Sequence, residues 1–271
     1  MACSSQFQSR SRRLSVLAAA LVLVTLAVAP GAAQAASPRM VALGDSYASG
    51  VGTRSYDSSS GSCQRSPYAY AVLDAARIGA SLSFQACSGA TTTAVKDNQL
   101  TTLSGATTYV TLTVGGNDAG FSSVLTECAQ PWWSSDCNGA IDKAQAFISN
   151  TLPSRLNALY AAVRTAAPHA RVVVVGYPRI FNGEDCNAGT WFSPSEETRL
   201  NQTADQLDAA IKKRASAYAY AFVDPRSAFV GHAVCDNPEW INGLSNPVSE
   251  SYHPNRTGQA GYADLVDDYL N

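Results

Sequence analysis

The stretch Val41-Ala42-Leu43-Gly44-Asp45-Ser46-Tyr47-Ala48-Ser49-Gly50 joins a short apolar run to a Gly-Asp-Ser turn. The pattern predicts a strand over residues 39–43 that ends in a tight turn and leads into a helix. In open α/β sheets, the loops at the carboxyl ends of the strands diverge and form a crevice in which ligands bind. Ser46 is therefore a candidate nucleophile, although Gly-Asp-Ser is also an ordinary turn sequence.

Four more segments have the pattern of strands, and two of them also end in turns rich in small residues. The strand at 82–86 runs into Cys87-Ser88-Gly89-Ala90, and the strand at 109–114 runs into Gly115-Gly116-Asn117-Asp118. The clearest strand is the β-branched run at 171–176, which is typical of a strand buried on both faces of a parallel sheet. A last strand is expected at 219–223.

Helical patterns alternate with these strands. We expect helices at 67–78, 92–98, 141–166, 195–217 and 257–269, with Pro153 kinking or splitting the third. Such alternation indicates an α/β fold whose parallel sheet is covered on both sides. About five strands in one domain predict a three-layer α/β/α sandwich with a flavodoxin-like parallel sheet.

The first 35 residues have the pattern of a secretory signal peptide. Three arginines within residues 10–13 precede an apolar run at 14–29, and Ala33-Gln34-Ala35 supplies a small-x-small cleavage site. The run is shorter than the ~20 residues that a membrane span needs, which disfavours an uncleaved anchor. We therefore expect a secreted, extracellular protein without a stable membrane anchor, with residues 36–271 forming a single domain.

The charge of the chain disfavours nucleic acid as a partner. Cleavage after Ala35 would leave 16 basic and 21 acidic residues, a net charge of about −5. A mildly acidic chain without a basic run does not fit nucleic acid. The sequence has no obvious coiled coil or internal repeat, so a monomer is expected.

Six cysteines remain after the predicted cleavage, and an even number in an exported chain indicates disulfides. A zinc site is disfavoured because the sequence contains no Cys-x-x-Cys. Sequence alone permits many pairings, and we expect the pairing of neighbours, in which each bond closes one local stretch. The expected pairs are Cys63 with Cys87, Cys128 with Cys137, and Cys186 with Cys235.

A serine hydroxyl group needs a base that accepts its proton near neutral pH, and histidine is the natural choice. His169 lies in a polar connection at a helix end, and His232 fits a structural or substrate-loop role. His253 lies in Glu250-Ser251-Tyr252-His253-Pro254-Asn255, where Pro254 is expected to begin the last helix and fix the loop ahead of it. His253 is therefore the candidate base.

Acyl transfer also needs hydrogen-bond donors for the oxyanion that develops in the transition state. The main-chain N–H groups of Ser46 and Gly89 and the side-chain amide of Asn117 are three donors at the ends of predicted strands. Gly89 has no side chain to keep a substrate from its N–H group. Gly115 and Gly116 allow the backbone to turn so that Asn117 faces the crevice.

The ordered residues Ser46, Gly89, Asn117 and His253 resemble the four blocks of the SGNH hydrolases, also called the GDSL esterases and lipases. Gly44-Asp45-Ser46 matches the first block, Gly89 the second, Gly115-Gly116-Asn117-Asp118 the Gly-x-Asn-Asp block, and His253 the last. The resemblance covers nearly all of residues 36–271. With its six cysteines, the chain is most similar to the secreted bacterial lipase and phospholipase branch, whose members carry three disulfides.

One position departs from the family pattern. The family usually has Asp three residues before the histidine, where this chain has Glu250. Some relatives in the secreted branch orient the histidine with the main-chain carbonyl two residues before it, which is that of Ser251 here. Glu250 can complete a triad, but a dyad of Ser46 and His253 is favoured because the Glu250 side chain must bend back over a short loop.

The resemblance implies a secreted lipase, esterase or phospholipase that cleaves acyl esters by covalent catalysis. His253 accepts the proton of Ser46, the three donors stabilise the oxyanion, and water hydrolyses the acyl-enzyme. This mechanism requires no metal and no organic cofactor. Asp45 is expected to hold the turn around Ser46, and Asp118 lacks neighbours at calcium-loop spacing.

Two other functions stay open. A carbohydrate acetyl esterase would use the same four blocks, and a secreted binding protein could keep the fold without catalysis. Aromatic residues in predicted loops can line an acyl groove, stack on sugar rings, or cover sheet edges and disulfide loops. These residues are Trp132, Trp133, Trp191, Phe192 and Trp240.

Overall fold

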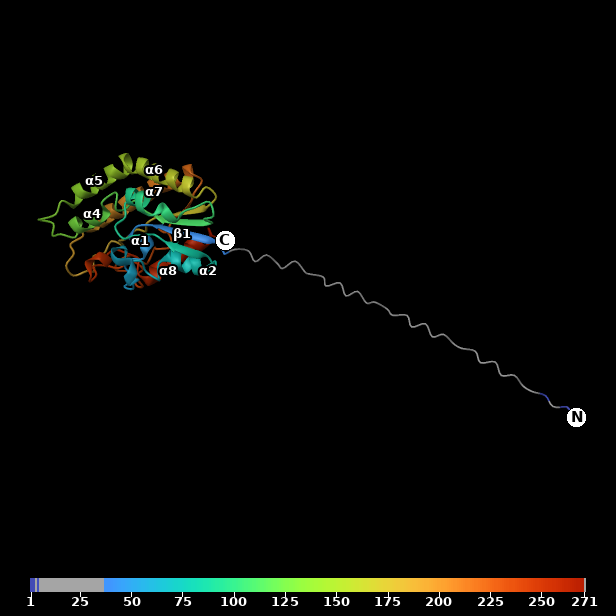
Figure 1. Ribbon diagram of the computed structural model, residues 1–271. Coiled ribbons are helices and arrows are strands. Elements are labelled where there is room, and N and C mark those ends of the chain that lie inside the picture. The colour runs from blue at the N-terminus through green and yellow to red at the C-terminus, as the bar shows by residue number, and fades with distance from the viewer. Residues whose placement is uncertain (3, 5–36, 271) are drawn as a thin grey trace. The chain divides into compact units, whose positions relative to one another are not determined.

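Figure 1 shows the computed structural model, which describes residues 1, 2, 4 and 37–270. Five parallel strands form one sheet in the order β2-β1-β3-β4-β5. This order is that of a flavodoxin-like sheet, so the predicted fold class is confirmed. The strands are β1 (Arg39–Gly44), β2 (Ser81–Phe84), β3 (Tyr109–Thr113), β4 (Arg171–Val175) and β5 (Ala221–Val223).

Helices cover both faces of the sheet. In Figure 1, α5, α6 and α7 lie on one side of β1, and α2 and α8 lie on the other. The α-helices are α1 (Ser46–Ser49), α2 (Tyr70–Arg77), α3 (Thr92–Asn98), α4 (Phe121–Cys128), α5 (Cys137–Asn150), α6 (Leu152–Ala166), α7 (Pro194–Ala217) and α8 (Arg256–Asp267). Short 3₁₀ helices are η1 (Ser58–Cys63), η2 (Leu100–Thr102) and η3 (Val248–Glu250).

Several element boundaries differ from the sequence prediction for local reasons. The helix expected at 141–166 begins earlier, at Cys137, and its expected split near Pro153 is confirmed. Pro153 lies in the first turn of α6, where its missing N–H group costs nothing. The prediction that Pro254 begins the last helix is wrong. The side chain of Asn255 caps α8 by accepting hydrogen bonds from the main-chain N–H groups of Thr257 and Gly258, so the helix begins at Arg256.

The turn after β1 depends on a glycine. Gly44 has φ +133°, and a Cβ atom there would lie 2.3 Å from the carbonyl oxygen of Thr113 at the end of β3. The absence of a side chain lets the main-chain N–H of Asp45 donate a 2.9 Å hydrogen bond to that same carbonyl. Ser46 consequently follows β1 beside β3, at the point where the strand order of the sheet reverses.

Among residues 37–270, three disulfides join the neighbouring cysteines expected from the sequence, Cys63 with Cys87, Cys128 with Cys137, and Cys186 with Cys235. The last of them links the loop after β4 to the loop after β5. Within residues 37–270, none of the helices is long and apolar enough to cross a membrane. The signal peptide predicted at residues 1–35 falls almost entirely outside the described residues.

Candidate active site

Ser46 is the first residue of α1 and is 8% exposed, at the carboxyl end of β1. Asp45 caps this helix by accepting a 3.0 Å hydrogen bond from the main-chain N–H of Tyr47, and it also accepts one from the hydroxyl of Tyr177. Burial raises the pKa of Asp45 to about 7. One partner, Tyr47, lies in the turn, and the other, Tyr177, packs against it. Asp45 therefore stabilises the conformation of the turn that contains Ser46.

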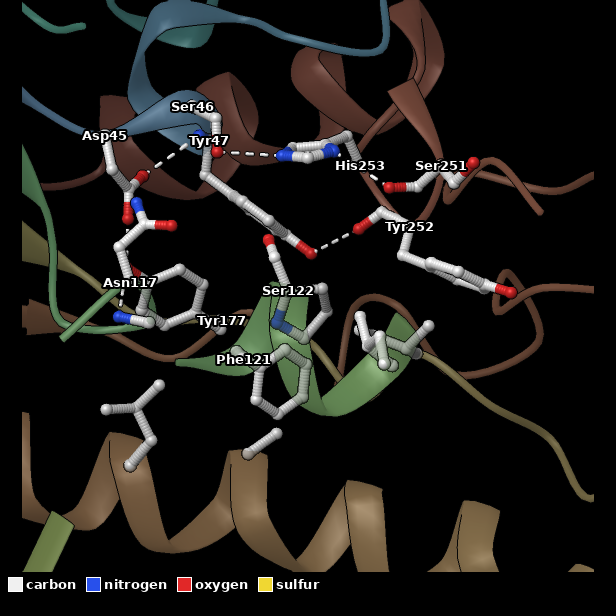
Figure 2. A pocket seen from close by; sticks show the side chains of 16 residues that line it. Asp45, Ser46, Tyr47, Asn117, Phe121, Ser122, Tyr177, Ser251, Tyr252 and His253 are labelled. Atoms are coloured by element: carbon white, nitrogen blue, oxygen red, sulfur yellow. Dashed lines mark hydrogen bonds between the residues drawn. The ribbon is translucent and has the colours of Figure 1, made fainter. Parts of the chain in front are cut away.

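His253 lies between Ser46 and Ser251 (Figure 2). Its Nε2 is 2.8 Å from Oγ of Ser46, and its Nδ1 is 2.9 Å from the main-chain carbonyl oxygen of Ser251. Because a carbonyl can only accept a hydrogen bond, Nδ1 carries the proton and Nε2 of a neutral ring can accept the proton of Ser46. Burial lowers the pKa of His253 to about 4, partly offset by the bond to Ser251, so the ring is neutral at pH 7.

Glu250 does not contact the imidazole. Its Oε1 accepts a 2.7 Å hydrogen bond from the hydroxyl of Tyr56, and its Oε2 lies 3.5 Å from Nε of Arg54. The side chain is buried, and the hydroxyl of Tyr56 in turn accepts a 3.1 Å bond from the main-chain N–H of Gly52. The carboxylate therefore ties the histidine loop to the loop that follows α1.

The two other predicted oxyanion donors differ in their surroundings. Asn117 lines the same pocket as Ser46, and its side-chain amide donates a 3.1 Å hydrogen bond to the carbonyl of Ala90. That bond leaves one amide hydrogen free and holds the loop that contains Gly89. Gly89 is exposed with φ +78°, and a Cβ atom there would meet nothing within 4 Å. Gly89 does not line the pocket itself, so its role in the oxyanion hole stays a prediction.

An apolar pocket extends from the serine and the histidine towards α4 and α7. Phe121 and Leu125 of α4 line it, together with Ile180 and with Leu207 of α7. No helix was expected at α4, although Phe121, Val124, Leu125 and Cys128 have the i, i+3, i+4, i+7 spacing of a helix face. A pocket of this kind suits an acyl chain better than a polar substituent.

A second, open groove meets the pocket at His253. The groove and the pocket share five lining residues, and the groove continues past the end of α4. The shared residues are Ser122, Leu125, Ser251, Tyr252 and His253.

In the part of the chain that the structure describes, no group of three His, Cys, Asp or Glu side chains is arranged to hold a metal ion. Asp118 accepts hydrogen bonds of 2.7 and 2.6 Å from the main chain and the hydroxyl of Thr92 and pairs with Arg155 at 3.3 Å. These bonds give it a structural role.

The aromatic residues considered from the sequence have different positions. Phe192 is buried against Phe181 and Tyr252, and Trp240 stacks on His232, whose Nδ1 bonds the carbonyl of Pro238. These residues therefore stabilise loops. Trp132, Trp133 and Trp191 remain 81%, 67% and 48% exposed.

A serine in contact with a neutral, partly buried histidine, at the switch point of such a sheet and beside an apolar pocket, defines a serine ester hydrolase. The model of the GDSL-like Lipase/Acylhydrolase family matches residues 42–260, and the chain belongs to this family. The resemblance found in the sequence is thereby confirmed.

Characterised relatives narrow the class further. A lipase of Streptomyces rimosus is 42% identical over 265 residues, which are 95% of this chain and 98% of that protein. Lipase 1 of Streptomyces coelicolor is 42% identical over 249 residues, 91% of each chain. The crystal structure of phospholipase A1 from Streptomyces albidoflavus NA297 has a TM-score of 0.81 at 44% identity, covering 86% of this chain and 100% of that one. The chain is thus a carboxylic ester hydrolase of the lipase branch, with acyl esters as its substrates.

Proposed function

We propose that Ser46 and His253 form the catalytic dyad of a secreted lipase and that the main-chain carbonyl of Ser251 orients the histidine. The observation that supports this most directly is the bridging position of the imidazole, 2.8 Å from Oγ of Ser46 and 2.9 Å from the carbonyl oxygen of Ser251. A carbonyl at Nδ1 fixes the tautomer that leaves Nε2 free, which is the task of the carboxylate in a triad. Glu250 is engaged with Tyr56 instead.

The reaction proceeds in two stages. His253 accepts the proton of Ser46 as Oγ attacks the ester carbonyl, and protonated His253 then gives this proton to the departing alcohol. Water next attacks the acyl-enzyme, its proton passes to His253, and Oγ of Ser46 leaves with that proton. The N–H groups of Ser46 and Gly89 and the amide of Asn117 stabilise the oxyanion in both stages, without a metal or organic cofactor.

The proposed substrates are lipids with medium or long acyl chains. The apolar side chains of Phe121, Leu125 and Leu207 line the same pocket as the nucleophile, and burying each methylene group of a substrate there is worth ~0.8 kcal/mol. Glycerophospholipids are included because a relative at 44% identity is named a phospholipase A1. The protein acts outside the cell as a monomer, as one domain over residues 36–271 after loss of the signal peptide.

A series of nitrophenyl esters from acetate to palmitate tests this proposal, with Ser46→Ala purified in parallel. We expect kcat/KM for medium-chain esters to exceed that for the acetate ester by about tenfold or more. The Ser46→Ala variant should be inactive on all of them. Cleavage of acetate alone would favour the carbohydrate esterase. Absence of cleavage by the folded protein would favour the binding protein.

A further inference from the structure

Trp132 and Trp133 lie in the loop between α4 and α5, and the part of the chain that the structure describes leaves both side chains largely exposed. Their exposed fractions are 81% and 67%, and their rings contact each other edge to face at 5.6 Å. In Figure 1 this loop is the end that projects beyond α4 and α5. Neither ring lines the pocket or the groove described above, so the two side chains do not enter the catalytic site.

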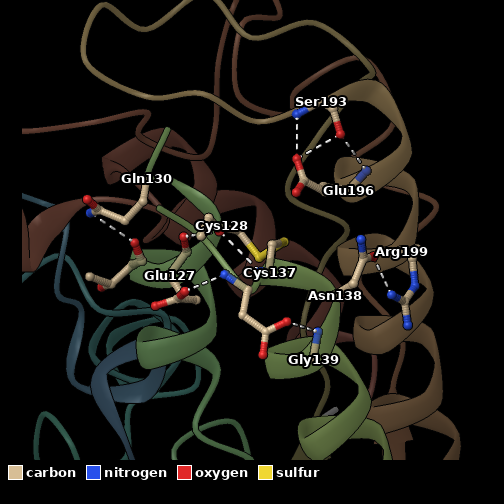
Figure 3. The surroundings of a disulfide bond; sticks show 12 residues. Glu127, Cys128, Gln130, Cys137, Asn138, Gly139, Ser193, Glu196 and Arg199 are labelled. Carbon is tan, nitrogen blue, oxygen red and sulfur yellow. Dashed lines mark hydrogen bonds between the residues drawn. A yellow bond between two sulfur atoms is a disulfide. The ribbon is translucent and has the colours of Figure 1, made fainter. Parts of the chain in front are cut away.

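The base of this loop is firmly held (Figure 3). The disulfide between Cys128 and Cys137 closes it. Glu127 accepts hydrogen bonds of 2.6 Å from the main-chain N–H of Asp136 and of 2.8 Å from the hydroxyl of Ser135. A tip presented by an ordered base loses less conformational entropy when its side chains bind a partner.

Arg199 of α7 fixes the loop from a second side. Its guanidinium group donates hydrogen bonds to Asn138 and, at 2.5 Å, to Asp142 in the first turns of α5. The start of α7 is itself fixed by a capping box, in which Ser193 and Glu196 bond each other's main-chain N–H groups. The tryptophan tip is thus anchored to the same helix that lines the acyl pocket.

The loop continues directly from the open groove. Ala129 and Gln130 line the groove, and the two tryptophans follow after Pro131. On other parts of the groove wall, Leu244 and Val248 are 39% and 70% exposed, and Trp191 follows groove-lining Thr190. Among the nine large hydrophobic side chains that the structure describes as exposed, five belong to these three segments. Exposed apolar surface is therefore concentrated around the mouth of the catalytic site.

The chemistry of this rim fits a lipid surface without net charge. Among the described residues that line the groove there is no Lys, Arg, Asp or Glu, and the chain left after cleavage behind Ala35 would have a net charge of about −5. An anionic surface would find no cationic partner in the groove. Tryptophan prefers the boundary between lipid and water, because its ring is apolar and its N–H group can remain hydrated.

We propose that Trp132 and Trp133, together with Trp191, Leu244 and Val248, dock the enzyme on a zwitterionic phospholipid surface with the groove facing the lipid. A lipid leaving the surface then enters the groove and reaches His253 without crossing bulk water. This inference rests on the proposed lipase function, since it gives the groove a lipid substrate.

The test separates docking from catalysis. The double variant Trp132→Ala/Trp133→Ala is compared with wild type in three assays: cosedimentation with phosphatidylcholine vesicles, hydrolysis of those vesicles, and hydrolysis of dissolved nitrophenyl butyrate. Tyr269→Ala is the matched control, because Tyr269 is an exposed aromatic residue that lines none of the cavities near the site. Binding is also measured in the Ser46→Ala background, where hydrolysis cannot alter the vesicles.

We expect the double variant to lose vesicle binding and vesicle hydrolysis by about tenfold or more, and to keep kcat/KM on the dissolved ester within about twofold. The proposal would be overturned if the double variant bound the vesicles as tightly as wild type does. Equal losses on vesicles and on dissolved ester would overturn it as well, by showing that the loop supports the site itself.

Failure of the proposed function has a different signature. In that case wild type would not cleave the dissolved ester, whatever its binding to vesicles. The two hypotheses can therefore fail independently.

Discussion

The hydroxyl of Tyr47 donates a 2.7 Å hydrogen bond to the main-chain carbonyl of Tyr252. Tyr47 directly follows Ser46, and Tyr252 directly precedes His253 (Figure 2). The ring of Tyr47 also packs on the imidazole, with ring centres 5.3 Å apart. One buried side chain thus links helix α1, which begins with the candidate nucleophile, to the loop that contains the candidate base.

Tyr47→Phe removes this link and keeps the ring. We expect kcat on nitrophenyl butyrate to fall by about fivefold with little change in KM, because a buried hydrogen bond is worth roughly 1 kcal/mol. Tyr269→Phe, which loses a hydroxyl group from an exposed ring, is the control. An unchanged kcat in Tyr47→Phe would show that the link does not help to position His253.

Glu250 distinguishes a dyad from a triad. In Glu250→Gln, the amide oxygen can still accept the bond from Tyr56, so we expect kcat to stay within about threefold of wild type. Glu250→Ala leaves the hydroxyl of Tyr56 without this partner and should lower the free energy of unfolding by about 1–3 kcal/mol, measured by urea denaturation. A loss of about a hundredfold in kcat for Glu250→Gln would mean that the carboxylate serves the histidine and that the dyad is wrong.

The pH profile reports the ionisation of His253. Catalysis needs the neutral ring, and burial lowers the pKa of His253 from 6.5 to about 4. We expect kcat/KM on a dissolved ester to stay level as the pH falls from neutrality and to decline only as the pH approaches 4. A midpoint near 6.5 in wild type would contradict this account, and His169→Gln, which changes an exposed histidine, should leave the profile unaltered.

The same shift has a consequence for stability. The unfolded chain binds a proton at His253 near the ordinary pKa of 6.5, whereas the folded chain does so only near 4. Between these values the unfolded state holds more protons, so the contribution of His253 to the free energy of unfolding decreases as the pH falls through this window. Comparison with His253→Gln by urea denaturation at several pH values measures this contribution.

Asn117 tests the proposed oxyanion hole. We expect Asn117→Ala to lower kcat by about a hundredfold or more with little effect on KM, because the donor acts on charge that develops in the transition state. Asn98→Ala is a matched control, since Asn98 also donates its amide to a main-chain carbonyl but lies on the exposed side of α3. A loss of less than about tenfold for Asn117→Ala would remove the residue from the oxyanion hole.

Much of the fold is predictable because the three central strands β1, β3 and β4 are buried on both faces. The run at β4 can only be an interior strand, and three strands that end in small residues locate the ligand-binding edge of the sheet. The separation of Ser46 and His253 in the sequence does not predict their distance in the folded chain. Their contact was expected from the family resemblance. α4 was missed because its eight residues, Phe121–Cys128, include two serines and a threonine, which weaken a helical pattern.

Other features depend on contacts that no local pattern encodes. Tyr56 and Glu250 are 194 residues apart, and only the folded chain shows that the carboxylate binds this tyrosine. The sequence also does not predict that Trp132 and Trp133 are exposed, because two tryptophans in a loop can be either buried or exposed to solvent. The role of Gly89 in the oxyanion hole rests on the sequence resemblance, and it stays a prediction.

The most direct test of the central claim is covalent labelling of Ser46. Wild type and Ser46→Ala are treated with a nitrophenyl alkylphosphonate, and the modified peptide is identified by mass spectrometry while ester hydrolysis is followed. We predict one adduct, on Ser46, in proportion to the loss of activity, and neither adduct nor activity in folded Ser46→Ala. An adduct on another residue of the pocket such as Ser122, or an active Ser46→Ala variant, would contradict the account.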